Sequence, residues 1–178
     1  MTTPIYIREE KQEDRPYVFK LIEAAFKEAV YTDHQEQFLV ERLRKSQAFI
    51  PELSLVAVFA EQIVGYILLS RIKIKGVNID HDSLAVAPVA VLPEYQNKGI
   101  GGLLLKEAHE RAKMLGFASA ILLGHASYYP KFGYKEAACF NIKLPFDVPS
   151  ENSMAIELVE NGLSGIEGRV EYPPEFFG

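Results

Sequence analysis

One strand–turn–helix segment constrains the fold of this chain more than any other. An apolar, strand-forming run from Leu84 to Leu92 is ended by Pro93, which lacks the backbone N–H that strand pairing requires. Gly99 and Gly101 follow, and a helix is predicted over 99–115 because apolar residues recur there at helical spacing. The buried stripe of this helix is predicted to be Leu104, Leu105, Ala108, Ala112 and Leu115.

The start of this predicted helix has the chemistry of an anion site. Its first backbone N–H groups lack partners within the helix, and the helix dipole favours a phosphate beside them. Glycine at 99 and 101 leaves room for a ligand against the backbone, and Lys98 and Gln96 can add hydrogen bonds from the side. The pattern also suits a plain tight connection, and it is not a dinucleotide fingerprint because a third glycine and a following acidic residue are missing.

The remaining elements place this segment in a mixed α/β fold. Strands are predicted at 5–8, 53–59, 63–75, 118–123, 134–140 and 154–159, with helices over about 15–29, where Asp14 is the expected N-cap, and 35–45. We expect a mostly antiparallel sheet of about seven strands with one parallel crossover, flanked by helices. A single domain over 1–178 is expected, with 146–178 forming a C-terminal strand and a surface extension.

Composition and charge exclude several classes of protein. The formal net charge is −5 and the basic residues are scattered, which speaks against a nucleic-acid binder. The sequence has neither an apolar run of ~18 residues nor a signal peptide, so we expect no membrane association and a cytoplasmic location. No Cys/His cluster has zinc spacing, so no metal is expected. Cys139 is the only cysteine, which suits a reducing compartment, and we expect it to be buried.

Two motifs resemble those of a known family. Residues 89–105, VAVLPEYQNKGIGGLLL, resemble the acetyl-CoA motif of the GCN5-related N-acetyltransferase (GNAT) family, Gln/Arg-x-x-Gly-x-Gly/Ala, whose fixed places are filled by Gln96, Gly99 and Gly101. Residues 122–134, LLGHASYYPKFGY, resemble the family's later motif, an aromatic–Tyr pair followed by a Gly–aromatic pair. Both occur in the family's order and spacing, and the residues of the second motif are similar to those of small bacterial predicted N-acetyltransferases.

The resemblance implies a cofactor site. In that fold the strands here expected at 84–92 and 118–123 are parallel neighbours that splay apart, and the pantetheine arm of acetyl-CoA pairs with the first strand. The backbone of Val89 and Val91 would bind its amides, and the Val91 N–H would polarise the thioester carbonyl. The cofactor-binding residues expected on this basis are Val89, Ala90, Val91, Gln96, Asn97, Lys98, Gly99, Ile100, Gly101 and Gly102.

Tyr129 occupies the place of the family's general-acid tyrosine, four residues before Gly133. The resemblance implies that it acts as an acid or hydrogen-bond donor to the CoA sulfur. Full proton transfer from a phenol of pKa ~10 to the thiolate of a thiol of pKa ~8.5 is uphill, so a hydrogen bond to the developing charge is the simpler role. The alternative is that Tyr128 and Tyr129 are both core aromatics.

The sequence departs from the family beside this tyrosine. The family has an Asn on or just after the second splayed strand, where this chain has Leu122, Gly124 and His125. How the pantetheine is held on that side is therefore open. His125 could contact the cofactor or the acceptor, or it could cap the turn.

The predicted reaction is direct transfer of acetyl from acetyl-CoA to a primary amine of a small molecule or peptide. The acceptor ammonium must first lose a proton, for which Glu28, Glu36 and Glu94 are candidates and a water chain is the alternative. A non-catalytic acyl-CoA sensor or partner-binding module is the alternative function, and O-acetyl transfer a third. The sequence names no acceptor, and it is compatible with a homodimer without requiring one.

Overall fold

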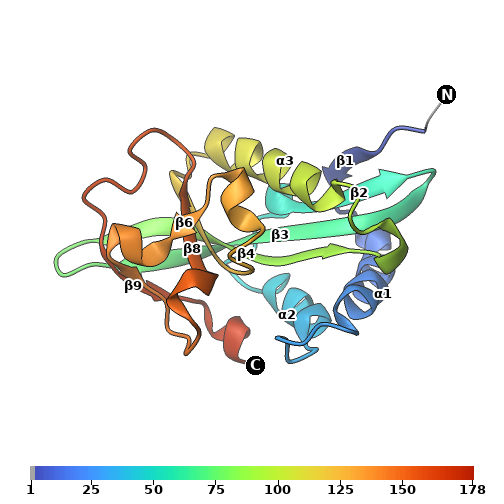
Figure 1. Ribbon diagram of the computed structural model, residues 1–178. Coiled ribbons are helices and arrows are strands. Elements are labelled where there is room, and N and C mark those ends of the chain that lie inside the picture. Colours follow the sequence, from blue (N-terminus) through green and yellow to red (C-terminus); the bar gives the residue numbers. More distant parts are fainter. Residues whose placement is uncertain (1–2) are drawn as a thin grey trace.

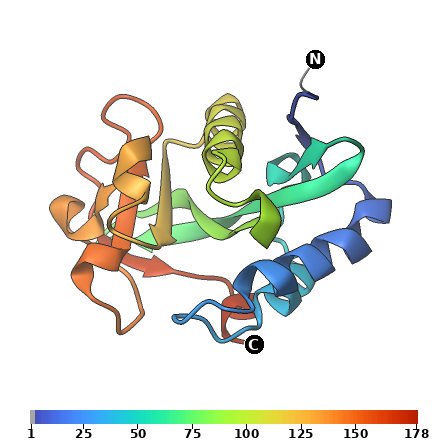
Figure 2. The same cartoon turned by 45° about the vertical axis from the view of Figure 1, so that its right-hand side comes forward.

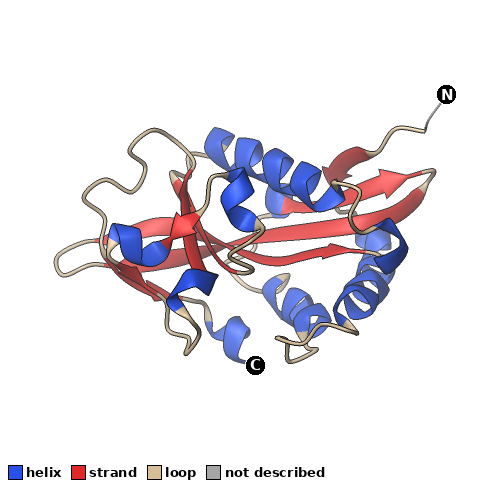
Figure 3. Cartoon of the chain, viewed as in Figure 1, coloured by secondary structure: helices blue, strands red, loops and turns tan. Residues whose placement is uncertain are grey.

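The computed structural model describes residues 3–178, and within them a mixed sheet of nine strands separates two layers of helices (Figure 1). The helix α3 covers one face of the sheet, and α1 and α2 cover the other (Figure 2). The helices are α1 (Arg15–Phe26), α2 (Glu36–Leu43) and α3 (Ile100–Met114). The strands (Figure 3) are β1 (Tyr6–Glu9), β2 (Ser54–Phe59), β3 (Gln62–Lys75), β4 (Asp80–Val91), β5 (Ser119–Leu123), β6 (Lys135–Glu136), β7 (Ile142–Lys143), β8 (Ser153–Glu157) and β9 (Gly168–Glu171).

The strands lie in the order β1-β2-β3-β4-β5-β8-β6, with β9 pairing both β3 and β7. Neighbours along this path are antiparallel except β4 and β5, which are parallel, as are β7 and β9. The expected mostly antiparallel sheet with a parallel pair, flanked by helices, is confirmed. The parallel pair is the product of the strand–turn–helix segment, because α3 carries the chain back across the sheet.

β4 leaves β5 soon after the two strands meet. Their register consists of one pair, Ala85 with Ile121, although β4 is 12 residues long. The register between β3 and β4 shifts just beyond that pair, where the two residues Ala87 and Pro88 stand opposite one residue of β3. A bulge of this kind bends its strand and increases the local twist. The C-terminal half of β4 therefore pairs with β3 while its other edge faces the space between β4 and β5.

Close packing holds α3 against the sheet. Ile100, Leu104 and Leu105 are buried in one core with Leu55 and Ile67 of the sheet. Gly65 on β3 permits this approach, because a Cβ built there would lie 3.0 Å from both Ile100 and Leu104. The start of α3 is thus fixed directly above the strand pair that carries the bulge.

Two sequence expectations about strands are corrected. The strand expected at 134–140 is only β6, because the chain enters a 3₁₀ turn at Ala137–Phe140 and reverses at Asn141, whose φ is +57°. The extension expected after residue 160 contains β9, which pairs with residues 73–75 of β3. β7 and β9, neither of which was predicted, raise the number within residues 3–178 from about seven to nine. The same 3₁₀ turn exposes Cys139, so the expectation that it is buried was wrong.

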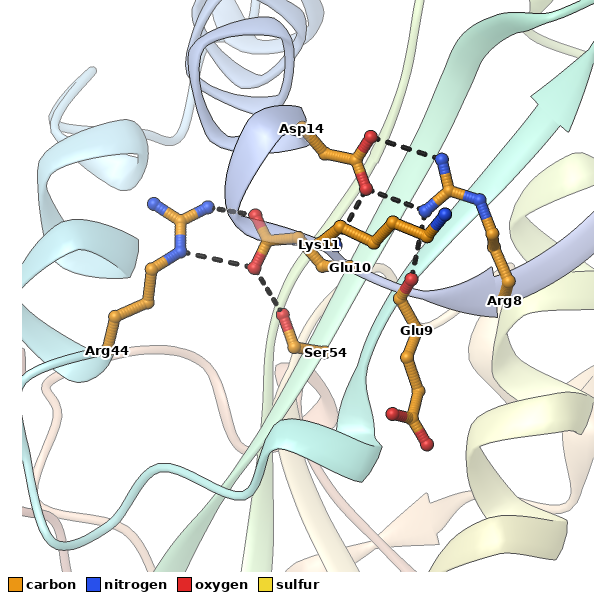
Figure 4. Close-up of polar contacts among 7 residues, drawn as sticks. All are labelled: Arg8, Glu9, Glu10, Lys11, Asp14, Arg44 and Ser54. Atoms are coloured by element: carbon orange, nitrogen blue, oxygen red, sulfur yellow. Dashed lines mark hydrogen bonds and ion pairs between the residues drawn. The ribbon is translucent and has the colours of Figure 1, made fainter.

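A buried polar network joins the segment around β1 to the two helices α1 and α2 (Figure 4). The Glu10 carboxylate accepts hydrogen bonds from Arg44 and from Ser54 Oγ, and the Glu10 and Arg44 side chains are 2% and 5% exposed. Asp14 precedes α1 as expected, but its carboxylate binds Arg8 (2.6 and 3.1 Å) and the Lys11 N–H (2.7 Å) rather than an N–H of α1. Its bond to Arg8 lowers the pKa of Asp14.

The Glu10–Arg44 pair yields a stability prediction. Arg44→Met leaves a buried carboxylate without its cation, so we expect the free energy of unfolding to fall by roughly 3–5 kcal/mol. Urea denaturation of the variant and the parent measures this. Lys75→Met, which removes the exposed partner of Asp80, is the control and should change little. An equal fall in the free energy of unfolding in the two variants would contradict the prediction that breaking the buried pair costs more than breaking the exposed one.

Candidate functional site

The end of β4, the start of α3 and the loop after β5 meet at one place. A Cβ built on Gly101 of α3 would lie 3.9 Å from Val89 Cγ1 and 2.9 Å from the Tyr128 hydroxyl oxygen. Tyr128 and Tyr129 belong to the segment 124–134, called here the aromatic turn, which lies beside α3 (Figure 1). The structure therefore brings the two sequence motifs into contact.

The N-terminus of α3 has backbone donors without a partner inside the helix. The first hydrogen bond of the helix is given by the Leu103 N–H to Gly99 O at 3.1 Å, so the N–H groups of residues 100–102 have no partner within it. Asn97 and Gly99 adopt left-handed φ values of +62° and +82°, which turn the chain sharply into the helix. Residues 96–99 are exposed. Such an array of N–H groups at a positive helix end is suited to an anion.

Gln96 and Lys98 flank this helix start. The Gln96 amide donates to the Val91 carbonyl at 3.0 Å, so it ties the turn back to β4 rather than pointing into open space. The Lys98 ammonium lies 5.2 Å from the centre of the Tyr95 ring. Of these two predicted phosphate contacts, Gln96 has a structural partner and Lys98 remains exposed.

The backbone of β4 at Val91 faces the gap between β4 and β5. The Leu92 N–H donates to Val64 O on β3 at 2.9 Å. Because adjacent residues of a strand direct their backbone groups to opposite sides, the N–H and C=O of Val91 point away from β3, and those of Val89 do likewise. The Gln96 bond to Val91 O agrees with this direction. Val89 and Val91 are half-buried and Ala90 is buried.

Three glycines, which lack a Cβ, leave space for the aromatic side chains of the aromatic turn. Gly101 faces the Tyr128 hydroxyl, while a Cβ on Gly102 would lie 2.9 Å from the Phe132 ring. A Cβ on Gly124 would lie 2.2 Å from the ring of Tyr129. The glycines of the first motif were expected to make room for a ligand; Gly101 and Gly102 also make room for the second motif.

Tyr129 is enclosed by aromatic rings. Its ring packs edge-on against Tyr128 (5.0 Å between centroids) and Tyr134 (5.8 Å). Burial, with a smaller contribution from Tyr128, raises the pKa of Tyr129 to about 12. The phenol is therefore neutral at pH 7 and can donate a hydrogen bond.

His125 and Asn152 define the β5 side of the gap. The His125 side chain is exposed, and its carbonyl accepts hydrogen bonds from the N–H groups of Tyr128 (3.1 Å) and Tyr129 (3.3 Å), so its backbone initiates the turn. Asn152, which the sequence did not single out, donates from Nδ2 to Gly124 O at 3.0 Å and accepts from the Gly124 N–H at 3.0 Å. No local signal identifies Asn152, because it reaches Gly124 across the β5–β8 pairing.

The three glutamates named as candidate bases differ in their surroundings. Glu28 and Glu94 are exposed. Glu36 is half-buried at the start of α2, where it accepts a hydrogen bond from Thr32, and its Oε2 is buried without a hydrogen-bond partner. Burial raises the pKa of Glu36. Glu36 is the member of this group whose surroundings make its carboxylate a stronger base than a solvated carboxylate.

Comparison with known proteins identifies the family. The profile of the acetyltransferase (GNAT) domain matches residues 51–136. The chain is 36% identical over 120 residues to the N-acetyltransferase YjhQ of Escherichia coli K12, an alignment that covers 66% of each chain. The chain therefore belongs to the GNAT family of acetyltransferases.

Two solved structures extend this similarity over the whole fold. The GNAT N-acetyltransferase YhbS of Escherichia coli, solved in complex with CoA, superimposes with a TM-score of 0.90 at 27% identity over 100% of this chain and 94% of that one. A GNAT acetyltransferase of Brucella melitensis, solved with acetyl-CoA, gives a TM-score of 0.80 at 29% identity, with 98% of this chain and 99% of that one covered.

No helix in residues 3–178 is long and apolar enough to span a bilayer. No group of three or more histidine, cysteine, aspartate or glutamate side chains in the same range is arranged to hold a metal ion.

His109 on the buried side of α3 yields a pH prediction. Burial, and less strongly Lys113, lower its pKa from 6.5 to about 4, and Glu110 opposes this. The unfolded chain therefore takes up a proton near pH 6.5 that the folded chain does not bind until about pH 4. We expect stability to fall by about 2 kcal/mol between pH 7 and pH 5 from this group alone.

Urea unfolding of the parent and of His109→Gln at pH 7, 6 and 5 measures the effect. The glutamine keeps hydrogen-bonding capacity without a titrating group, so the decline between pH 7 and pH 5 should be shallower in the variant. Parallel declines in both proteins would contradict the prediction.

Proposed function

We propose that this protein transfers an acetyl group from acetyl-CoA to a primary amine of a small molecule or peptide. The observation that carries the proposal is the meeting of an anion-binding helix start, a strand edge facing a gap, and a neutral, half-buried tyrosine. The CoA bound to YhbS and the acetyl-CoA bound to the Brucella protein support the choice of cosubstrate.

The residues present fit a CoA molecule on chemical grounds. The N–H groups of residues 100–102 would receive the pyrophosphate at the exposed start of α3, with Asn97, Lys98 and Gly99 around it. This resolves the difficulty of binding a polyanion to a chain of net charge −5, since backbone dipoles supply the positive potential locally. The gap-facing backbone of Val89 and Val91 would pair with the pantetheine amides as an added strand does.

Acetyl-CoA supplies the acyl group as a thioester. The neutral amine nitrogen bonds to the carbonyl carbon, the carbon–sulfur bond breaks with its electron pair leaving on sulfur, and the nitrogen gives up one proton to water. The Val91 N–H would donate to the carbonyl oxygen as negative charge develops there. The Tyr129 hydroxyl would donate to the departing sulfur. No covalent intermediate on the protein is required.

The raised pKa of Tyr129 favours one of its two candidate roles. Full transfer of its proton to a thiolate would be uphill, because burial makes this phenol a weaker acid than free tyrosine, whose pKa of ~10 already exceeds the ~8.5 of a thiol. A hydrogen bond stabilises the thiolate without that cost. We therefore assign Tyr129 as a hydrogen-bond donor rather than a proton-transferring acid.

Tyr129→Phe tests this role with the smallest change to packing. We expect turnover to fall roughly 100-fold, because one donor to the developing charge is lost, while acetyl-CoA affinity stays within about twofold. Thiol release across a panel of primary amines, peptides and alcohols measures turnover, and calorimetry measures affinity.

The same panel separates this function from its alternatives. Thiol release that requires an amine supports N-acetyl transfer, release with alcohols alone indicates O-acetyl transfer, and binding without release indicates an acyl-CoA sensor. Equal turnover of the parent and Tyr129→Phe would remove Tyr129 from the mechanism.

Gly101→Val tests the phosphate site. The valine side chain would enter space occupied by the Tyr128 hydroxyl and would cover the helix start, so we expect acetyl-CoA affinity to fall at least roughly tenfold. Gly116→Ala, at the open C-terminal end of the same helix, is the control, and its affinity should be unchanged. Unchanged affinity in Gly101→Val by calorimetry would refute the assignment.

A further inference from the structure

A buried polar pair that the mechanism does not use lies at the end of the aromatic turn. His109 Nε2 and the Tyr134 hydroxyl lie 2.8 Å apart, and the two residues are 8% and 2% exposed. They come from different elements, since His109 lies on α3 and Tyr134 is the last residue of the aromatic turn. A histidine on the apolar face of a helix satisfies its nitrogen at a desolvation cost that an apolar residue there avoids.

Tyr134 connects this pair to the proposed site. Its ring centroid lies 5.5 Å from that of His109 and 5.8 Å from that of Tyr129, whose ring it meets at 77°. The hydroxyl is fixed by α3 while the ring edge forms part of the enclosure of Tyr129. A displacement of Tyr134 is therefore transmitted directly to Tyr129.

Tyr129 has little freedom to compensate for such a displacement. On its opposite side the ring lies so close to the backbone of Gly124 that a Cβ there would fall 2.2 Å from a ring carbon. Tyr128 closes a further side at 5.0 Å. The position of the Tyr129 hydroxyl is thus set by three neighbours, of which Tyr134 is the one anchored to a helix by a hydrogen bond.

We propose that His109 and Tyr134 are positioning residues, which hold Tyr129 at the end of β4 through the hydrogen bond between Tyr134 and α3. This proposal rests on the proposed function, because it assigns a purpose to the pair only if Tyr129 acts on the departing sulfur. The pair does not touch the reacting atoms in this scheme. It sets the distance and direction of the hydroxyl that does.

Tyr134→Phe tests the proposal against a matched change. It removes the hydroxyl and keeps the ring, and Tyr66→Phe does the same to a buried tyrosine whose hydroxyl lies 2.8 Å from Ser54 Oγ on the other face of the sheet. We expect Tyr134→Phe to lower kcat roughly tenfold with acetyl-CoA affinity within about twofold, because a small misplacement of a reacting group is costly. Tyr66→Phe should reduce thermal stability to a similar degree and leave kcat unchanged. Equal kcat values in the parent and Tyr134→Phe would overturn the proposal, as would equal losses of kcat in the two variants.

A double variant separates action through Tyr129 from any other effect. If Tyr134 acts through Tyr129, then Tyr129→Phe/Tyr134→Phe should be no slower than Tyr129→Phe alone. A further tenfold loss in the double variant would overturn the proposal. Full turnover of Tyr129→Phe alone would overturn both the role of Tyr129 and the positioning role of His109 and Tyr134. If Tyr129→Phe is slow but Tyr134→Phe is as active as the parent, only the positioning role is overturned.

The partner residue gives a second route should Tyr134→Phe fold poorly. His109→Gln retains a group that can bond the Tyr134 hydroxyl, and His109→Leu does not. We expect the glutamine variant to keep a kcat several-fold above that of the leucine variant when both are folded by circular dichroism and bind acetyl-CoA alike. Equal kcat values in these two variants would count against the hydrogen bond.

Discussion

β4 and β5 are hydrogen-bonded where Ala85 meets Ile121 and then separate, because the bulge at Ala87–Pro88 turns β4 aside. Every part of the proposed site is arranged around this separation. The divergence leaves the backbone of Val91 facing the gap instead of a neighbouring strand. An unpaired strand edge inside a protein is costly unless something satisfies it, so the same feature that weakens the sheet creates a place for a ligand with amide groups. The sheet remains stable there because β3 pairs with β4 along its whole length.

The start of α3 and the aromatic turn depend on each other through missing side chains. Gly101, Gly102 and Gly124 each lie where the ring or hydroxyl of an aromatic residue occupies the position of a Cβ. The glycines of the first motif therefore serve two purposes: they leave the helix N–H groups accessible, and they allow Tyr128 and Phe132 to approach. Cofactor binding and the placement of Tyr129 are consequently properties of one packed unit, although the sequence carries them in two motifs.

The sequence predicted the local parts of this arrangement well. The strand–turn–helix segment follows from spacing and backbone chemistry, and the structure has α3 at Ile100–Met114 against the expected 99–115. Of the buried stripe predicted for this helix, Leu104, Leu105, Ala108 and Ala112 are buried, whereas the prediction for Leu115 was wrong because it caps the helix end and is 44% exposed. The other predictions that failed depend on distant partners. β9 forms because β3 offers it an edge more than 90 residues earlier in the chain, and the strand expected from Tyr134 ends early because its neighbour β8 pairs with only two residues of β6. Asn152 and His109 were missed for the same reason, since their partners, Gly124 and Tyr134, are reached only in three dimensions.

The pairing of β9 with β3 has a consequence for the order in which the chain acquires its structure during synthesis. Residues 73–75 emerge from a ribosome long before Arg169–Glu171 exist, and at ~5–20 residues per second the interval is on the order of ten seconds. During that time Ile74, wholly buried in the finished protein, lacks the cover of Val170. Residues 174–177, with the Glu175 carbonyl bound by Arg42 of α2 at 2.9 Å, arrive later still. The helix start proposed to bind phosphate can thus form during translation before the opposite end of the sheet is closed.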